Sequence, residues 1–380
     1  MNKKIVIIII IFGVLAIGAG VYFAWQKSGQ QPQGTASQAT DQNNYGKMTL
    51  PISGTTNSKM RILSKENVLA YWVDNFSTST AGQDVFYISS SGNINKISGG
   101  NETTLSNENF GTLKFAKALA ISNKILIVFK QDNSVVPIIF NLSTGEWQPL
   151  LGQKSATAVD LSLDGKKIAY LVPNSQGTAD LFTLDLTNNK AKAIKLTSLN
   201  IKDIDLKWIN DNNIVFMPKS SFDFISEVWD YNIQAKTFSK IAGGSGLMLN
   251  WSKFGDVALE FSAAQNKNYS LSLIDNNGNI KGGFKFLTFP DKCFISSPSQ
   301  IYCAVSRDQN AFNGLTLPDD YLKRGIYFKD GIYQVDITQN KFQALFEGED
   351  PVIDATNLTL DGSKLLFINR YDNKLYSLDI

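Results

Sequence analysis

The string Thr183-Leu184-Asp185-Leu186, in which an Asp follows a short apolar run, returns in related forms along the 380-residue chain. Successive copies are 44, 47, 43, 61 and 43 residues apart, with the Asp or Asn at Asn141, Asp185, Asn232, Asp275, Asp336 and Asp379. A period of about 40–45 residues built from short strands is typical of the blades of a β-propeller. An Asp or Asn side chain can bond the backbone of the next turn, so these residues are expected to cap turns.

Each repeat divides into four strands, a to d, separated by turn signals such as Asp164-Gly165. An apolar strand b recurs seven times, at Val68–Val73, Ile125–Phe129, Ile168–Val172, Ile214–Phe216, Val257–Phe261, Ile301–Val305 and Leu365–Ile368. Such nearly unbroken apolar runs fit strands buried on both faces between neighbouring sheets. The sequence therefore predicts an all-β, seven-bladed β-propeller, with six or eight blades as alternatives.

The last repeat stops at Ile380, at the end of its strand c, and so lacks a strand d. A ring left open there would expose an unpaired strand edge. The segment 46–52 has strand character, and its Pro51 is compatible with an outer edge strand. We therefore expect residues 46–52 to close the ring, in a propeller domain spanning 46–380.

Closure by a strand d brings the incoming chain to the face that carries the a–b and c–d turns. The opposite face, here called the b–c face, carries the b–c and d–a connections. The long connections are assigned to this b–c face, at 74–83, 173–178, 218–226 and 307–329. Because binding residues concentrate on loops held by a rigid scaffold, we expect the b–c face to bind a partner.

The first 25 residues predict a transmembrane helix. The 21 residues from Ile5 to Trp25 carry no charge, which is enough to cross a hydrocarbon core of about 30 Å. Two lysines precede this stretch and only Lys27 follows closely, which predicts a cytoplasmic N-terminus and an extracytoplasmic propeller. Residues 26–45 are rich in Gln, Ser and Gly and read as a disordered linker. A cleaved signal peptide, with small residues at 16–20, is the alternative.

The two cysteines of the chain, Cys293 and Cys303, flank a turn at Pro298. A hairpin there places them opposite each other on strands a and b of the sixth repeat. In an oxidising compartment this arrangement predicts a disulfide, and two buried thiols are the alternative. Two thiols without a histidine supply half of a zinc site, so no metal is expected.

The 61-residue gap contains an insertion that begins at Arg307 and runs to about Gly325. Loops longer than about 12–15 residues are usually functional or disordered. The side chains best suited to contact a partner there are Asp319, Asp320, Tyr321 and Arg324. The alternative is a loop that packs over the end of its blade.

The chain contains no histidine, which excludes a Ser-His-Asp triad and histidine-ligated metals. Glycoside hydrolysis needs only two carboxylates, but no spacing marks such a pair. The string at 275–279 lacks the last acidic ligand of a calcium loop and reads as a turn.

Basic and acidic residues number 36 and 34 without a basic stripe, so no nucleic-acid partner is expected. We expect no catalytic residue and no cofactor.

Two strings carry a resemblance to a known family: Ser162-Leu-Asp-Gly-Lys-Lys-Ile-Ala-Tyr170 and Thr359-Leu-Asp-Gly-Ser-Lys-Leu-Leu-Phe367. They resemble the repeats of TolB-like and WD40-like propellers, over about residues 59–380. The C-terminal third, at 290–293, 317–320 and 375–378, is also similar to uncharacterised membrane-anchored propellers of candidate-phylum bacteria. The resemblance implies an envelope protein and assigns no activity. Seven predicted blades depart from the six typical of TolB-like domains.

The leading interpretation is a single-pass membrane protein of the cell envelope whose propeller binds a protein or a surface polymer through its b–c face. One alternative is a carbohydrate-active hydrolase that uses carboxylates in the central channel. Another is a structural spacer without a dedicated ligand. The sequence names no ligand and no oligomeric state.

Overall fold

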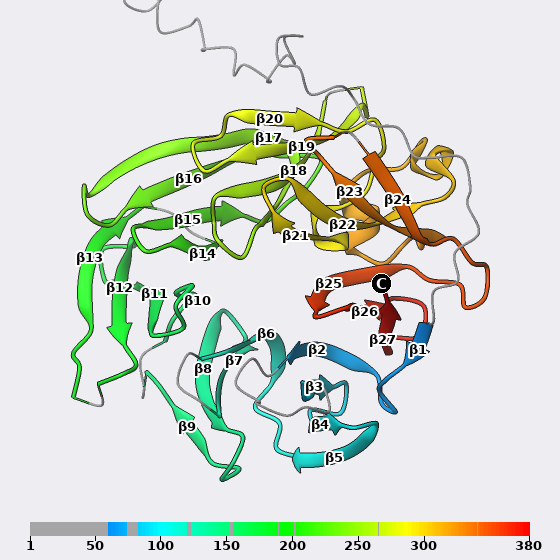
Figure 1. The fold of residues 1–380 in the computed structure, drawn as a ribbon. Helices are drawn as coiled ribbons and strands as arrows, with labels where there is room; N and C mark the ends of the chain where they lie inside the picture. The colour runs from blue at the N-terminus through cyan, green and yellow to red at the C-terminus, as the bar shows by residue number, and fades with distance from the viewer. Residues whose placement is uncertain are drawn as a thin grey trace, which may run out of the picture. The chain divides into compact units, whose positions relative to one another are not determined.

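The computed structural model describes residues 60–73, 83–119, 123–151, 155–188, 190–200, 203–264, 266–339 and 341–380. These residues form 27 strands in six antiparallel sheets, which follow one another in chain order around a ring (Figure 1). None of the helices in this part of the chain is long and apolar enough to span a bilayer. The predicted anchor, Ile5 to Trp25, and the linker at 26–45 lie outside the described residues.

The first three sheets each contain four strands in sequence order. The first consists of β2 (Val68–Val73), β3 (Val85–Ser89), β4 (Ile94–Ser98) and β5 (Asn101–Ser106). The second consists of β6 (Thr112–Ala118), β7 (Lys124–Gln131), β8 (Ser134–Asn141) and β9 (Trp147–Pro149). The third consists of β10 (Ala158–Leu161), β11 (Lys167–Pro173), β12 (Ala179–Asp185) and β13 (Ile194–Leu199).

The fourth sheet has seven strands, and the last two sheets have four each. The fourth consists of β14 (Ile204–Asn210), β15 (Asn213–Pro218), β16 (Ile225–Asn232), β17 (Thr237–Trp251), β18 (Val257–Ala263), β19 (Tyr269–Asp275) and β20 (Ile280–Gly283). The fifth consists of β21 (Cys293–Ser297), β22 (Gln300–Ser306), β23 (Asp330–Asp336) and β24 (Lys341–Phe346). The sixth consists of β25 (Ala355–Asp361), β26 (Lys364–Asn369), β27 (Leu375–Asp379) and β1 (Met60–Ile62).

The long strand β17 serves two successive four-stranded units. Its residues Thr237–Ser245 pair with β16, and from Ser245 to Trp251 it pairs with β18. The register shifts between Ser245 and Met248, where the strand passes from one unit to the next. The seven-stranded sheet is therefore two antiparallel meanders that share β17.

The core is divided into seven hydrophobic clusters, each formed between two successive four-stranded units. One of them joins the first sheet to the last, since Tyr87 and Ile97 belong to the same cluster as Leu366 and Ile368. Another lies within the seven-stranded sheet and contains Val215, Trp251 and Ala258, among others. Every unit thus buries apolar side chains against both of its neighbours, which explains the apolar runs read from the sequence.

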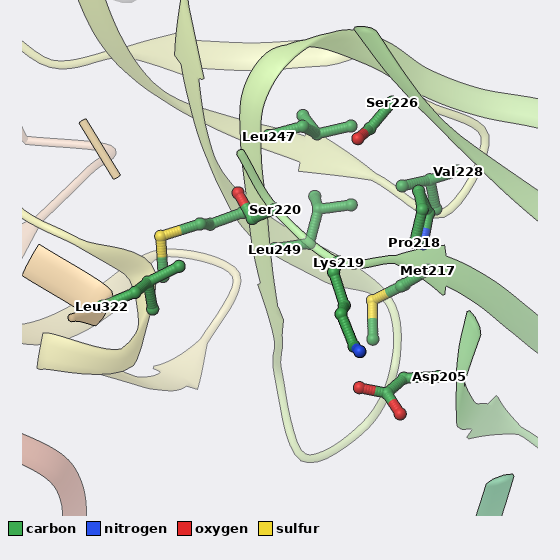
Figure 2. Close-up of a pocket in the computed structure, with 11 residues that line it drawn as sticks. Asp205, Met217, Pro218, Lys219, Ser220, Ser226, Val228, Leu247, Leu249 and Leu322 are labelled. Atoms are coloured by element: carbon green, nitrogen blue, oxygen red, sulfur yellow. The ribbon is translucent and has the colours of Figure 1, made fainter. Parts of the chain in front are cut away.

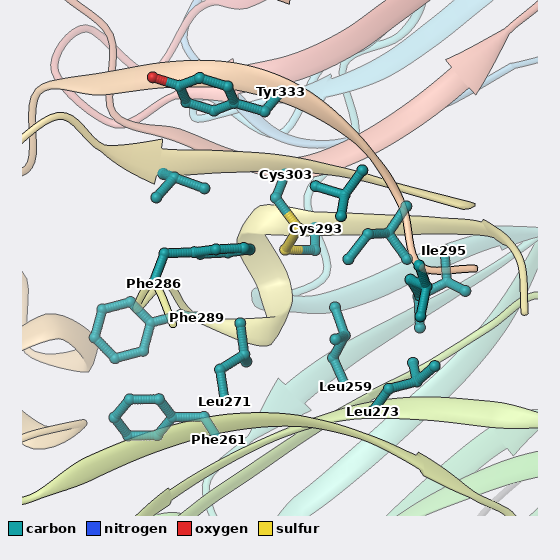
Figure 3. Close-up of a cluster of buried hydrophobic side chains, with 14 of the residues drawn as sticks. Leu259, Phe261, Leu271, Leu273, Phe286, Phe289, Cys293, Ile295, Cys303 and Tyr333 are labelled. Atoms are coloured by element: carbon teal, nitrogen blue, oxygen red, sulfur yellow. A yellow bond between two sulfur atoms is a disulfide. The ribbon is translucent and has the colours of Figure 1, made fainter. Parts of the chain in front are cut away.

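The disulfide predicted between Cys293 and Cys303 is present. These two residues are directly opposite in the register of β21 and β22, and Pro298 lies in the turn between the strands. Figure 3 shows the disulfide among the buried side chains of Phe286, Phe289 and Ile295.

The repeated Asp and Asn residues end the third strand of their units, as the period predicts: β8, β12, β16, β19, β23 and β27 end with them. Five of them accept hydrogen bonds from the following turn; Asp185 Oδ1, for example, accepts from the Thr187 N–H at 2.8 Å. The sixth, Asp379, lies at the chain end and pairs with Arg61 of β1 at 3.2 Å. The prediction that these residues cap turns is confirmed for the five.

Among the described residues, the strand that closes the ring is β1, which pairs with β27 and has Arg61 opposite Ser377. Residues 46–52, expected to supply this strand, lie outside the described residues. The two edges of β27 are occupied by β26 and β1. The closing strand is still a strand d, and the chain still enters on the face of the a–b and c–d turns.

One strand assignment in the first repeat is wrong. Val68–Val73 is the first strand of its sheet rather than the second, because β1 before it belongs to the last sheet. The connection from β2 to β3, whose residues 74–82 lie outside the described residues, therefore joins strands a and b rather than b and c. The other three long connections follow β11, β15 and β22, and they join strands b and c as expected.

Proline scanning of β1 tests the closure. Leu63 N–H donates to the Leu375 carbonyl at 2.8 Å, and hydrogen-bonded pairs alternate, so the Arg61 N–H also points to β27 and the Ile62 N–H points away. We expect Arg61→Pro to lower the free energy of unfolding by about 1–3 kcal/mol. Urea unfolding measures this loss. Ile62→Pro and Arg61→Ala are the controls, and a loss of the same size in Ile62→Pro would contradict the closure.

Asp230 in β16 predicts a pH dependence of stability. Burial raises the pKa of this carboxyl to about 6, against a donated hydrogen bond from Asn213. Because the unfolded carboxyl titrates near pH 4, the folded state holds the proton more tightly, and stability falls as pH rises from about 4 through about 6. Asp230→Asn is expected to raise the Tm at neutral pH by roughly a few degrees, a gain that vanishes near pH 4. The exposed Asp223→Asn is the control for thermal scans, and a gain independent of pH would contradict the assignment.

Candidate functional site

The first strands of the four-stranded units surround a cavity of about 520 Å³, here called the central cavity. Its lining comes from six of these strands or from residues beside them, namely β2, β6, β14, β17, β21 and β25. Residues that are far apart in the chain, such as Tyr71, Lys207 and Thr359, therefore share one space. The ring geometry alone brings them together.

One wall of the central cavity is cationic. Lys114 and Lys117 of β6, Lys207 of β14 and Lys253 after β17 all line it. Lys114 is ion-paired with Asp205, and Lys117 with the buried Asp160 of β10.

Lys207 lies close to the same ion pair. The neighbouring ammonium of Lys117 and burial lower the pKa of Lys207 to about 8, against the attraction of Asp160. The second oxygen of Asp160 accepts the Trp208 N–H at 2.8 Å. The carboxylate of Asp160 thus pairs with the Lys117 ammonium and also attracts that of Lys207. The pair of lysines therefore carries one positive charge that Asp160 does not balance.

The remaining wall is mostly apolar. It includes Leu69, Met248, Phe294 and Leu358, and Trp251 with 7% of its surface exposed. The indole N–H of Trp251 is buried and meets no hydrogen-bond acceptor among the described residues.

Asp291 is the carboxylate that lines the central cavity within the described part of the chain. Its Oδ2 accepts hydrogen bonds from Tyr321 at 2.8 Å and Thr356 at 3.2 Å, and its Oδ1 is buried without a partner there. Burial raises the pKa of Asp291. A carboxylate-dependent glycosidase needs two facing carboxyl groups, and the other carboxylates beside this wall, Asp160 and Asp205, are ion-paired with lysines.

A second cavity, of about 410 Å³, opens on the b–c face between the two meanders of the seven-stranded sheet (Figure 2). We call it the Met-lined pocket, because Met217 and Met248 are in its wall. Figure 2 shows Leu322 reaching toward it from the long insertion, opposite Met217 and Val228. Methionine side chains adapt to different apolar partners, so this lining suits a protruding apolar side chain.

Large apolar side chains are exposed on the b–c face, and one of them, Leu322, lines the Met-lined pocket. Phe224 and Ile225, where the connection from β15 reaches β16, are 70% and 79% exposed. Further exposed residues lie on b–c and d–a connections of the last two sheets: Leu322, Tyr327, Val352 and Tyr371. On the described a–b and c–d turns, the exposed large apolar residues are Leu163 and Phe254. The b–c face is therefore the more apolar of the two loop faces.

The insertion is packed onto the end of its sheet, which is the alternative that the sequence left open. It contains the short helices η2 (Gln309–Phe312) and α2 (Asp319–Leu322). Tyr321 is buried, stacked on Phe289 at a centroid distance of 3.8 Å, with Arg370 4.1 Å from its ring. Tyr321 is thus a core residue and is not free to contact a partner.

The other three candidate residues of the insertion also make contacts within the chain. Asp319 accepts hydrogen bonds from Ser221 and from the Phe222 N–H, the latter at 2.7 Å. Asp320 accepts from the Thr316 N–H at 2.7 Å. Arg324 is exposed and donates to the Asn373 side chain at 2.7 Å. Asp319 and Asp320 therefore shape the b–c face, and Arg324 is the candidate that stays accessible on it.

A buried ionic network holds the insertion in place. Lys292, in the 3₁₀ helix η1 (Pro290–Lys292), contacts Asp330 at 2.7 Å and Asp354 at 2.6 Å. Arg370 contacts Asp354 at 2.9 Å and donates to the Tyr321 carbonyl at 2.9 Å. Burial opposes the charge of Lys292, but the two carboxylates outweigh burial and raise its pKa. We interpret this network as structural, because each of its charges has a partner.

Solved β-propellers are similar to this chain. An oligogalacturonate lyase from Vibrio parahaemolyticus has a TM-score of 0.61 and 11% identity, over 86% of this chain and 94% of its own. The tricorn protease has a TM-score of 0.51 and 10% identity, over 87% of this chain and 34% of its own. The C-terminal WD40 domain of Sif2 has a TM-score of 0.50 and 11% identity, over 86% of this chain and 99% of its own.

These likenesses confirm the propeller fold and its WD40-like character. At such identities they show the fold alone, and the three proteins include a lyase, a protease and a WD40 domain. No protein-family model and no curated protein matches the sequence. The more specific resemblance to TolB-like domains stays a prediction.

The buried ionic network predicts which residues hold the insertion. Arg370→Met leaves the buried Asp354 with one cationic partner and Tyr321 without its stacked guanidinium. We expect it to cost about 3–5 kcal/mol of unfolding free energy and to accelerate limited proteolysis between residues 313 and 325. Arg324→Ala is the matched control, since its exposed contact with Asn373 is worth little. Equal proteolysis rates in the two variants would contradict this role of the network.

Proposed function

We propose that this chain is a non-catalytic binding module, a seven-bladed propeller of the cell envelope that docks a protein partner on its b–c face. The observation that carries the proposal is the concentration of exposed apolar side chains on that face, around the Met-lined pocket. Exposed apolar patches on soluble domains are commonly interaction sites. The partner is expected to insert an apolar side chain into the Met-lined pocket.

Two features support seven blades. The shared strand β17 divides the seven-stranded sheet into two meanders, and the other five sheets supply one unit each. Seven hydrophobic clusters join successive units, including the first to the last. Each cluster then corresponds to one interface between neighbouring blades.

A protein partner fits this face better than a polar polymer does. Phe224 and Ile225 are exposed and directly precede Ser226, which lines the pocket. The apolar walls of the pocket include Met217, Val228 and Leu247. Energetically dominant contacts in protein complexes are large side chains that enter well-packed, desolvated pockets. The apolar part of the pocket lining consists of methionine and aliphatic side chains, which suit an apolar side chain of a protein, beside the polar residues Asp205, Lys219, Ser220 and Ser226.

The membrane anchor proposed at residues 5–25 lies upstream of the described residues, which begin at Met60 at the start of β1. We propose that this anchor attaches the propeller to the membrane.

Site-specific photo-crosslinking tests the docking face. A photoreactive phenylalanine replaces Phe224 in one variant and Phe254 in another, and the full-length protein is irradiated in membranes of its own organism. Phe254 is a matched control because it is 57% exposed on an a–b turn. We expect a discrete crosslinked protein from position 224 and none from position 254.

A second substitution makes the crosslinking result specific. Ile225→Asp places a charge beside the photoreactive group at an exposed position that the fold does not need. We expect it to reduce the crosslink at 224 at least tenfold. The same products from both positions, a crosslink that survives Ile225→Asp, or a crosslink to polysaccharide alone would overturn the proposal.

A further inference from the structure

We infer that the central cavity binds a small organic anion, with its oxyanion group held by Lys117 and Lys207 and its body against the apolar wall. This site is distinct from the Met-lined pocket on the b–c face. The charges, the apolar wall and the size of the central cavity support this assignment.

The cationic wall has more positive charge than its neighbours balance. The single carboxylate of Asp160 is ion-paired with Lys117, attracts Lys207 and accepts the Trp208 N–H. Lys253 has no carboxylate within 4.0 Å among the described residues. Two ammonium groups held close together by the fold are unfavourable unless an anion joins them. A carboxylate, sulfate or phosphate group supplies that charge and accepts hydrogen bonds from both.

The apolar wall of the central cavity favours an organic anion over an inorganic ion, because it offers contact to an apolar part of the ligand. Met248, Phe294 and Leu358 offer apolar contact. An organic anion with an apolar body would bury that body against this wall.

The volume of about 520 Å³ fits a small molecule. Cavities of roughly 300–1,000 Å³ are typical of small-molecule sites. The two shared lining residues, Met248 and Leu249, place the Met-lined pocket beside the central cavity. A small anion could therefore reside in the ring while the b–c face engages a protein.

Calorimetric titration of the full chain in detergent tests the inference with benzoate as the probe and benzyl alcohol as its neutral analogue. We expect benzoate to bind at millimolar concentration and benzyl alcohol not to bind. Lys207→Met removes the unbalanced charge but keeps the pair of Lys117 and Asp160, and it should lower the affinity for benzoate at least tenfold. Asp160→Asn removes the competing carboxylate and should raise the affinity for benzoate severalfold. Lys195→Met, in a surface ion pair with Asp180, should have no effect.

The affinity for benzoate should change in opposite directions in these two variants, which distinguishes an effect on binding from an effect on folding. If the lysines served only to hold the strands together, Lys207→Met and Asp160→Asn would both loosen the cavity and shift affinity in the same direction. That result would overturn the inference. So would benzoate affinity unchanged in Lys207→Met, or equal binding of benzoate and benzyl alcohol.

A pH profile gives an independent readout. Lys117 from β6 and Asp160 from β10 are the charged groups that act on Lys207, and Lys114, Lys253 and Asp291 line the same cavity. Benzoate stays ionised from about pH 7 to about pH 9, while Lys207 loses its proton over this interval, so affinity should fall severalfold. The Lys207→Met variant should lose that dependence. An identical profile in both proteins would overturn the role of Lys207.

Discussion

The pairing of β1 with β27 is the constraint on which the rest of the domain depends. Each four-stranded unit covers its apolar faces only with its two neighbours, so an open end would leave one cluster half exposed. The three-residue strand β1 adds few contacts of its own. It nevertheless fixes the first unit beside the last, and the cluster of Tyr87, Ile97, Leu366 and Ile368 then completes the ring.

The repeat predicted most of the fold because its turns and inner strands require particular types of side chain, which recur in the sequence. An Asp or Asn at the end of each third strand bonds the next turn, and inner strands must be apolar on both faces. The closing strand could not be predicted in the same way. Met60, Arg61 and Ile62 are too few to show a period, and their role is set by backbone hydrogen bonds to β27, which leave no pattern of side chains in the sequence. Because β1 was not recognised as part of the last sheet, the strand at 68–73 was assigned as the second strand of its sheet, although it is the first.

The candidate site was harder to predict, for physical reasons. Tyr321 and two aspartates in a long insertion look available for a partner, but Tyr321 is equally suited to stack in a core and the aspartates to cap local turns. The buried Lys292, Asp330, Asp354 and Arg370 that decide the matter are spread over 79 positions of sequence. A signal for the central cavity did exist. Lys114, Lys117 and Lys207 each have an apolar or aromatic residue on either side in their strands, and only the ring shows that they face one space.

The closing strand also orders events during synthesis. β1 leaves the ribosome among the first segments of the domain, and its partner β27 is the last, with 312 residues between Ile62 and Leu375. Domains begin to fold while the chain is still being made, so the early sheets form beside a β1 that has no edge to join. Until translation is complete, that strand and the flank of the first sheet remain open to other chains. The flank of the first sheet is thus the part of the domain that stays uncovered longest.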